Sequence, residues 1–125
     1  MYESEKLPDI VENDVDKFIP KTKGYKLLIA IPAVKEASDG GIIRPDMWRS
    51  REETASIVGR VIDVGPDAYK DTQKFPSGAY CEAGDWIMFR SYSGTRFKIR
   101  GQEFRLINDD SVEAVVDDPS HYERV

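Results

Sequence analysis

The sequence predicts a small all-β domain, either a β-barrel or a β-sandwich. Short runs of β-branched and aromatic residues alternate with turns that contain Gly or Pro, and helical periodicity is almost absent. A chain of 125 residues with 40% hydrophobic and 33% charged residues is the size of one globular domain that can bury its own core. We therefore expect a single β domain with short extensions.

The first three strands are marked by composition and by what stops them. Tyr25–Ile31 is an apolar run that ends at Pro32. Thr54–Val64 predicts a second strand, and Gly59 within it indicates a bulge or a sharp bend. Trp86–Phe89 predicts a third, short strand.

The last part of the chain predicts a hairpin and one further element. Arg96–Ile99 and Glu103–Ile107 read as strands, and the turn at Arg100–Gln102 joins them. Val112–Val116 is compatible with a short strand, or with one helical turn capped by Asp110 or Ser111.

Four other segments carry no strand pattern. Residues 1–24 form an N-terminal extension, in which a short helix over 11–18 is compatible with the sequence, and 117–125 form an acidic tail that follows the domain at 25–116. Two long irregular connections lie inside the domain, at about 33–53 and 66–84. Irregular connections of this length are usually functional or disordered.

Charge and cysteine usage exclude several classes of protein. The net charge is −5, but residues 1–16 and 109–125 each hold six acids and one base, so the middle of the chain is basic. An acidic total argues against a nucleic-acid binder. One cysteine excludes an internal disulfide, and we find no membrane-span or signal-peptide pattern, which indicates a cytoplasmic protein.

The sequence contains few residues that are suited to catalysis. The single histidine, His121, lies in the acidic tail, where we expect it to be solvated. Cys81 lacks an electropositive setting and is expected to be an inert, packed thiol. The pairs Asp109–Asp110 and Asp117–Asp118 do not match a calcium loop and are interpreted as solvated turns. We therefore expect no enzyme activity, no metal and no cofactor.

Residues 90–105 hold five basic residues and one acid, interleaved with Tyr92, Phe97 and Phe104. On a barrel surface such a segment could stack bases and hold phosphates, which makes a single-stranded nucleic-acid-binding β-barrel the alternative function. The structural interpretation places Phe97 and Ile99 in the core and the alternating basic side chains in solvent. We favour the structural interpretation.

The motif Gly40-Gly41-Ile42-Ile43 lies inside the first long connection. Two β-branched apolar residues at a loop tip either fold back over one end of the barrel or form a hydrophobic hook for a partner. The residues alone do not decide between these two interpretations.

The order of the motifs along the chain resembles the GroES family of co-chaperonins. The resemblance covers roughly 25–116 and rests on six pieces in the family's order: Tyr25–Ile31, Gly40–Ile43, Gly59–Gly65, Ala83–Phe89, Tyr92–Gly94, and Glu103–Ile107 with Ser111–Val116. It implies a small GroES-like β-barrel with a long mobile loop. It also implies assembly into a seven-membered ring that caps the folding chamber of an ATP-driven, GroEL-type chaperonin.

The resemblance further implies which residues make contacts. Apolar residues after the Gly pair dock on the chaperonin's apical domain, and here Arg44 stands where the family has a third apolar residue. The expected binding residues are therefore Gly40, Gly41, Ile42, Ile43 and Arg44, with Met47 and Trp48 as substitute apolar contacts.

The family's first and last strands pair between neighbouring subunits. This pairing implies interface residues Leu27, Ile29, Ile31, Val112, Val115 and Val116. The extensions and the atypical connection at 66–84, which does not look like the family's roof hairpin, are similar to those of bacteriophage-encoded variants.

Overall fold

The computed structural model describes residues 15–32, 57–122 and 124–125, and within them the fold is almost entirely β. Its strands are β1 Lys26–Ala30, β2 Val58–Val64, β3 Trp86–Phe89, β4 Thr95–Ile99, β5 Gln102–Asn108 and β6 Val112–Val116. Two short 3-10 turns, η1 Asp109–Ser111 and η2 Pro119–His121, flank β6. The predicted all-β class is confirmed, and the last element is a strand.

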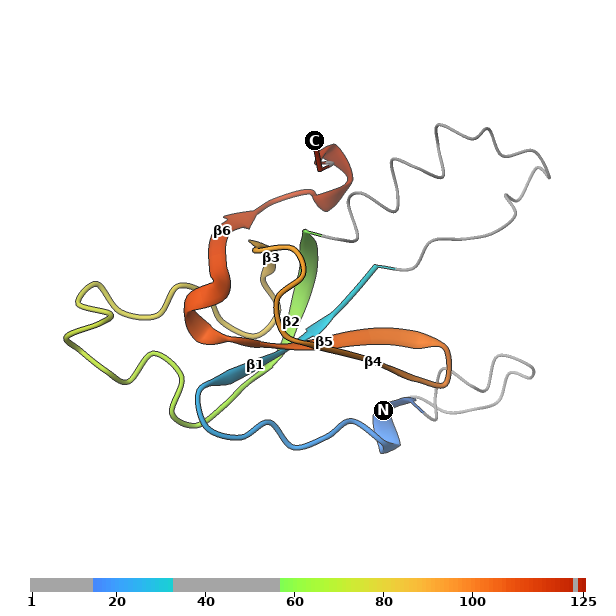
Figure 1. Ribbon diagram of the computed structural model, residues 1–125, viewed down its shortest axis with the longest axis horizontal. Helices are drawn as coiled ribbons and strands as arrows, with labels where there is room; N and C mark the ends of the chain where they lie inside the picture. The colour runs from blue at the N-terminus through green and yellow to red at the C-terminus, as the bar shows by residue number, and fades with distance from the viewer. Residues whose placement is uncertain (1–14, 33–56, 123) are drawn as a thin grey trace.

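All strand pairings are antiparallel and build one sheet in the order β4-β5-β1-β2-β3-β6 (Figure 1). The first strand of the sequence lies in the middle of the sheet, where residues 26–30 pair with β5 on one side and with β2 on the other. Among the described strands, β4 and β6 are the two edges.

The sheet wraps around one apolar core. The core draws side chains from β1, β2, β3 and β5 and from the connection between β2 and β3; its least exposed members include Leu27, Ile29, Val61, Ile87, Phe89 and Ile107, at 0–1% exposure. Burying an aliphatic or Phe side chain of this size stabilises the fold by about 1.5–3 kcal/mol. This core fixes the curvature of the sheet and the positions of its loops.

A second apolar cluster lies on the opposite face of β1 and β5, because neighbouring residues of a strand point to opposite faces. Leu28 and Phe104 are 0% and 3% exposed there, and the ring of Phe97 stacks on that of Phe104 with centroids 5.7 Å apart. The prediction that Phe97 and Ile99 enter the main core is therefore wrong. Arg96 pairs with Arg105, and Arg105 pairs with the core residue Ile29. Arg96 therefore lies on the face of the sheet that points toward the main core.

Gly59 is required by packing and not by a bulge. A Cβ on Gly59 would lie 2.3 Å from Cγ2 of Ile29 on β1, so only glycine lets the two strands approach at this point. The register between β1 and β2 does shift, but between Leu28 and Ile29, which leaves Ile62 as the extra residue on β2. The sequence thus predicted a bulge in the correct strand at the wrong residue.

The β4–β5 hairpin closes through the predicted turn. Ile99 pairs with Gln102, and the two residues between them have positive φ, 49° at Arg100 and 88° at Gly101. A two-residue turn of this kind matches the right-handed twist of the strands that it joins.

The N-terminal segment reaches the tip of this hairpin. Residues 15–17 are helical, and the guanidinium of Arg100 lies over the ring of Phe18, 5.2 Å from its centroid. The part of the predicted helix at 11–14 is outside the described residues.

Candidate functional site

The connection between β1 and β2 leaves the fold from two adjacent, firmly held strand ends. The backbone N–H of Ile31 donates to the carbonyl of Glu103 (3.0 Å), and the side-chain amide of Gln102 donates to the carbonyl of Ile31 (2.9 Å). On the other side, the N–H of Phe89 donates to the carbonyl of Ile57 (2.8 Å). The sheet therefore anchors both ends of the connection.

The predicted binding residues belong to this connection. Gly40, Gly41, Ile42, Ile43, Arg44, Met47 and Trp48 all fall between 33 and 56, outside the described residues. The structure fixes where the connection begins and ends, and the role of these residues stays a prediction.

The residues predicted for a subunit interface are mostly inside the subunit. Leu27, Ile29, Ile31, Val112 and Val116 are buried in a single subunit, whereas Val115 on β6 is 51% exposed. Strand β1 already pairs along both edges, so it has no free edge for the last strand of a neighbour. The expected pairing of Tyr25–Ile31 with the last strand of a neighbour therefore needs correction. The last strand itself, β6, does have an open edge in the described sheet.

The basic and aromatic segment 90–105 does not form a platform for stacked bases. Phe104 is buried, and Phe97 is half-buried and stacked against it, so the two rings are engaged with each other. Tyr92 is 78% exposed, with the guanidinium of Arg124 5.8 Å from its ring centroid. The alternative function in nucleic-acid binding therefore loses the stacking surface on which it depended.

Arg105 is a buried charge that the sequence did not reveal. Its side chain on β5 is 2% exposed, and its guanidinium lies over the ring of Phe89, 5.0 Å from the centroid. Burial, with a smaller effect of nearby Arg96, lowers the pKa of Arg105 below its ordinary value. In the sequence, Arg105 is only one residue of the predicted strand Glu103–Ile107.

The connection between β2 and β3 contains no strand over residues 65–85 and is held by aromatic packing. Tyr69, Phe75 and Tyr80 contact one another with ring centroids 4.9–5.2 Å apart. Gly78 and Gly84, with φ of 94° and 100°, supply the turns that this irregular path requires. The prediction that this segment is not a hairpin is confirmed.

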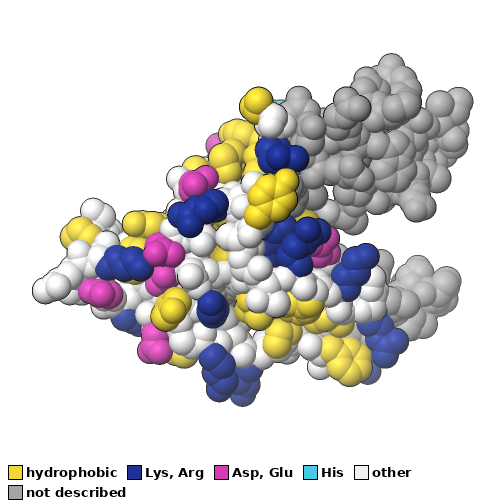
Figure 2. Space-filling model, in the orientation of Figure 1, with side chains coloured by type: hydrophobic (Ala, Val, Ile, Leu, Met, Phe, Trp, Pro, Cys, Tyr) yellow, Lys and Arg dark blue, Asp and Glu magenta, His cyan; other side chains and the backbone are white. Residues whose placement is uncertain are grey.

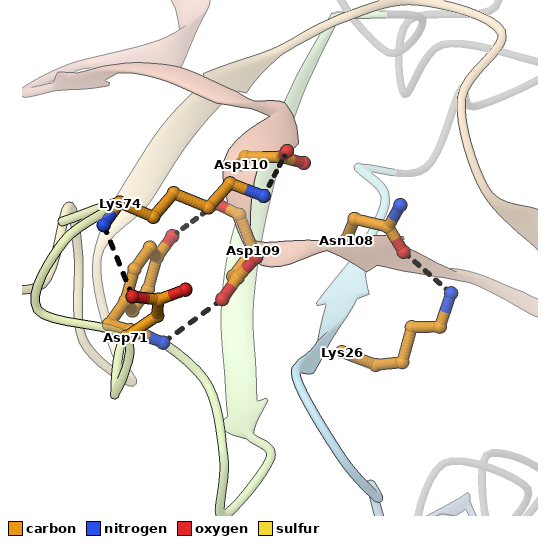
Figure 3. A network of polar contacts seen from close by, with 7 residues as sticks. Lys26, Asp71, Lys74, Asn108, Asp109 and Asp110 are labelled. Carbon is orange, nitrogen blue, oxygen red and sulfur yellow. Dashed lines mark hydrogen bonds and ion pairs between the residues drawn. The ribbon is translucent and has the colours of Figure 1, made fainter.

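Hydrogen bonds and an ion pair join this aromatic segment to turn η1 (Figure 3). Asp109 accepts a hydrogen bond from the N–H of Tyr69 through Oδ2 (3.0 Å), and the Tyr69 hydroxyl donates to the Asp109 carbonyl (2.7 Å). Lys74 forms an ion pair with Asp110 (2.8 Å). Asp109 is 4% exposed, so its interpretation as a solvated turn residue is wrong. No local sequence signal distinguished it from Asp110.

The titratable candidates for catalysis are in unreactive settings. Cys81 is a buried free thiol whose Sγ lies 3.7 Å from the Tyr69 hydroxyl, and burial raises the pKa of Cys81. Burial likewise raises the pKa of Tyr69 far above its ordinary value. His121 is exposed and lies 3.5 Å from a carboxylate oxygen of Asp118.

The described ranges contain neither a metal-binding cluster nor a membrane-spanning helix. No group of three or more His, Cys, Asp or Glu side chains is arranged there to hold a metal ion. Nor does any helix within those ranges have the length and apolar character to cross a membrane.

Similarity to known proteins shows which family the chain belongs to. Residues 21–116, which include all six strands, match the family described as Chaperonin 10 Kd subunit. The chain is 32% identical over 95 residues to a Co-chaperonin GroES of Caldicellulosiruptor saccharolyticus, covering 76% of this chain and 94% of the relative. It is 30% identical over 97 residues to a Co-chaperonin GroES of Solidesulfovibrio magneticus, covering 78% and 96%. The chain therefore belongs to the chaperonin 10 kDa subunit family, the family of the GroES co-chaperonins.

Proposed function

We propose that this chain is a non-enzymatic co-chaperonin that caps a GroEL-type chaperonin and assists ATP-dependent protein folding. The observation that carries the proposal is the family match over 21–116, together with relatives named Co-chaperonin GroES that align over nearly their whole length. Both strand ends that bound the connection at 33–56 are pinned to the sheet, which suits a segment presented to a partner.

The proposed contact is the hydrophobic hook Ile42–Ile43 after the Gly pair. Ordering a loop on a partner costs about 1–2 kcal/mol per residue in backbone entropy, so one hook binds weakly. Several hooks on one ring bind together, because each bound hook raises the effective concentration of the others. Such an arrangement gives tight capping that is still reversible.

We further propose that the subunits assemble into a ring through the open edge of β6. An exposed strand edge with an apolar side chain such as Val115 is a natural site for pairing with another chain. Seven subunits, a cytoplasmic location and a bacteriophage origin stay predictions from the resemblance.

The test is refolding of a substrate that depends on both chaperonin and co-chaperonin. We expect the double variant Ile42→Asp/Ile43→Asp to lower the refolding yield to that of chaperonin alone, because two charges replace the apolar hook. The matched control is Ile62→Asp, on β2 at 36% exposure, which should retain wild-type yield.

Light scattering after size exclusion separates loss of the hook from loss of the ring. The double variant and wild type should have the same mass, a multiple of the 14.2 kDa subunit. Full refolding activity of the double variant would refute the assigned hook. A wild-type chain that stays monomeric at micromolar concentration would refute the ring.

A further inference from the structure

The core-side face of the β4–β5 hairpin concentrates positive charge. Arg96 pairs directly with Arg105, and Lys98 pairs directly with Glu103, so these four side chains share one face of the sheet. We call Arg96, Lys98 and Arg105 the basic face. Figure 2 shows Lys and Arg side chains along the right-hand side of the described surface, together with hydrophobic and acidic side chains.

Glu103, the one carboxylate that the hairpin places on this face, is already engaged. The Nε of Arg96 donates to Glu103 Oε2 at 2.9 Å, whereas Arg105 reaches only the carbonyl of Ser93, through one nitrogen at 3.4 Å. The Nε of Arg105 has no hydrogen-bond partner among the described residues. Lys98 forms no ion pair within the described part of the chain, so the basic face carries more positive charge than Glu103 neutralises.

The acidic N-terminal extension leads up to this hairpin. Phe18 lies under Arg100 at the hairpin tip, so residues 1–14 continue from a point close to the turn that follows β4. Those fourteen residues contain five acids and one base: Glu3, Glu5, Asp9, Glu12 and Asp14 against Lys6. Extended chain spans up to about 3.3–3.6 Å per residue, so fourteen residues can follow the whole length of the five-residue strand β4.

We propose that the acidic N-terminal stretch, residues 1–14, binds the basic face of the β4–β5 hairpin of its own subunit. Lys98 and Arg96 contact its carboxylates, and the buried Arg105 adds its charge from beneath. Attachment at Phe18 keeps the acidic stretch at high effective concentration, which lets individually weak surface ion pairs act together. The C-terminal tail is a poorer occupant, because Asp118 already caps Ser120 and lies beside His121.

The first test is zero-length carbodiimide cross-linking of the full-length wild-type protein, followed by peptide mass spectrometry. We expect amide bonds between carboxylates of residues 1–14 and the Lys98 amine at 20 mM salt, with at least fivefold less product at 500 mM salt. Lys70, an exposed lysine of the connection between β2 and β3, is the internal reference. Equal cross-linking to Lys70 and Lys98, or none to Lys98, overturns the proposal.

Mixing isotope-labelled and unlabelled chains before cross-linking identifies the subunit that supplies the acidic stretch. Products within one isotope population support binding within the subunit, and mixed products overturn that assignment in favour of a neighbouring copy.

The second test is hydrogen exchange, which does not depend on a lysine. A variant with Glu3, Glu5 and Glu12 changed to Gln and Asp9 and Asp14 changed to Asn keeps the side-chain shapes and removes the charges. We expect peptides covering 95–102 to exchange two- to fivefold faster in this variant at low salt. The control Asp117→Asn/Glu123→Gln removes charge from the tail and should leave those peptides unchanged. Unchanged exchange in the N-terminal variant, or an equal effect in the control, overturns the proposal.

Discussion

Asp109→Ala should loosen the connection between β2 and β3, although the side chain is remote in sequence from that segment. The substitution removes the acceptor of the Tyr69 N–H and leaves a buried donor unpaired, while the bond from the Tyr69 hydroxyl to the Asp109 carbonyl can persist. An unsatisfied buried donor costs about 1–3 kcal/mol. With a urea dependence of about 1–3 kcal/mol per molar for a small protein, the unfolding midpoint should fall by roughly 1 M.

Asp110→Ala is the matched control, because it removes the neighbouring carboxylate with the same change in charge. Its ion pair with Lys74 joins side chains that are 41% and 51% exposed, so solvent screens it and the midpoint should move much less. Both variants are measured at one protein concentration, because assembly shifts apparent stability. If Asp110→Ala destabilised the protein as much as Asp109→Ala, the assigned role of the buried carboxylate would be wrong.

Two further predictions concern strain and burial. Gly94→Ala and Gly101→Ala both place alanine at positive φ, 81° and 88°, but only at Gly94 would the new Cβ meet a backbone atom, the Leu106 carbonyl at 2.2 Å. The strain of alanine in the left-handed region should therefore lower the stability of each variant by roughly 1–2 kcal/mol. Overpacking should lower the stability of Gly94→Ala by about 1–3 kcal/mol more. Equal thermal unfolding of the two variants would contradict the close approach at Gly94. Burial raises the pKa of Cys81 and shields its thiol, so the folded protein should alkylate more slowly than the unfolded chain at pH 8, in a thiol-reagent assay. Because the folded pKa is the higher one, the thiol stabilises the fold below the unfolded pKa of about 8.5, and stability should fall as pH rises above that value. Cys81→Ala should remove that slope, and an identical slope in this variant would argue against the thiol as its source.

The strands were predictable because their signals are local. An apolar run that ends at Pro32 located β1, and alternation with a Gly-containing turn located the β4–β5 hairpin, each to within a residue or two. Trp86–Phe89 and Val112–Val116 coincide with β3 and β6. Each signal lies within the segment that it describes, so no knowledge of the partner strand was needed.

The failures share a physical cause, which is contact between distant segments. Gly59 was interpreted as a bulge because the local sequence does not show that Ile29 fills the space where a Cβ would lie. Asp109 was interpreted as solvated because the local sequence does not reveal its hydrogen bond with Tyr69, forty positions earlier. The basic side chains of β4 are exposed as predicted, but Phe97 was assigned to the wrong core because a second apolar cluster, built on Leu28 and Phe104, competes with the main core for aromatic side chains. The predicted binding residues between 33 and 56 lie outside the described residues, so their role stays a prediction.

The central position of β1 has a consequence for biosynthesis. Lys26 pairs with Asn108, a partner synthesised 82 residues later, so the middle of the sheet stays incomplete until almost the whole chain has been translated. At a synthesis rate of about 5–20 residues per second, β1 waits roughly 4–16 s for β5. Its residues Leu27, Leu28 and Ile29, which are fully buried in the finished fold, lack their β5 neighbour during that delay. A protein of the co-chaperonin family thus passes through the kind of vulnerable nascent state from which chaperones protect other chains.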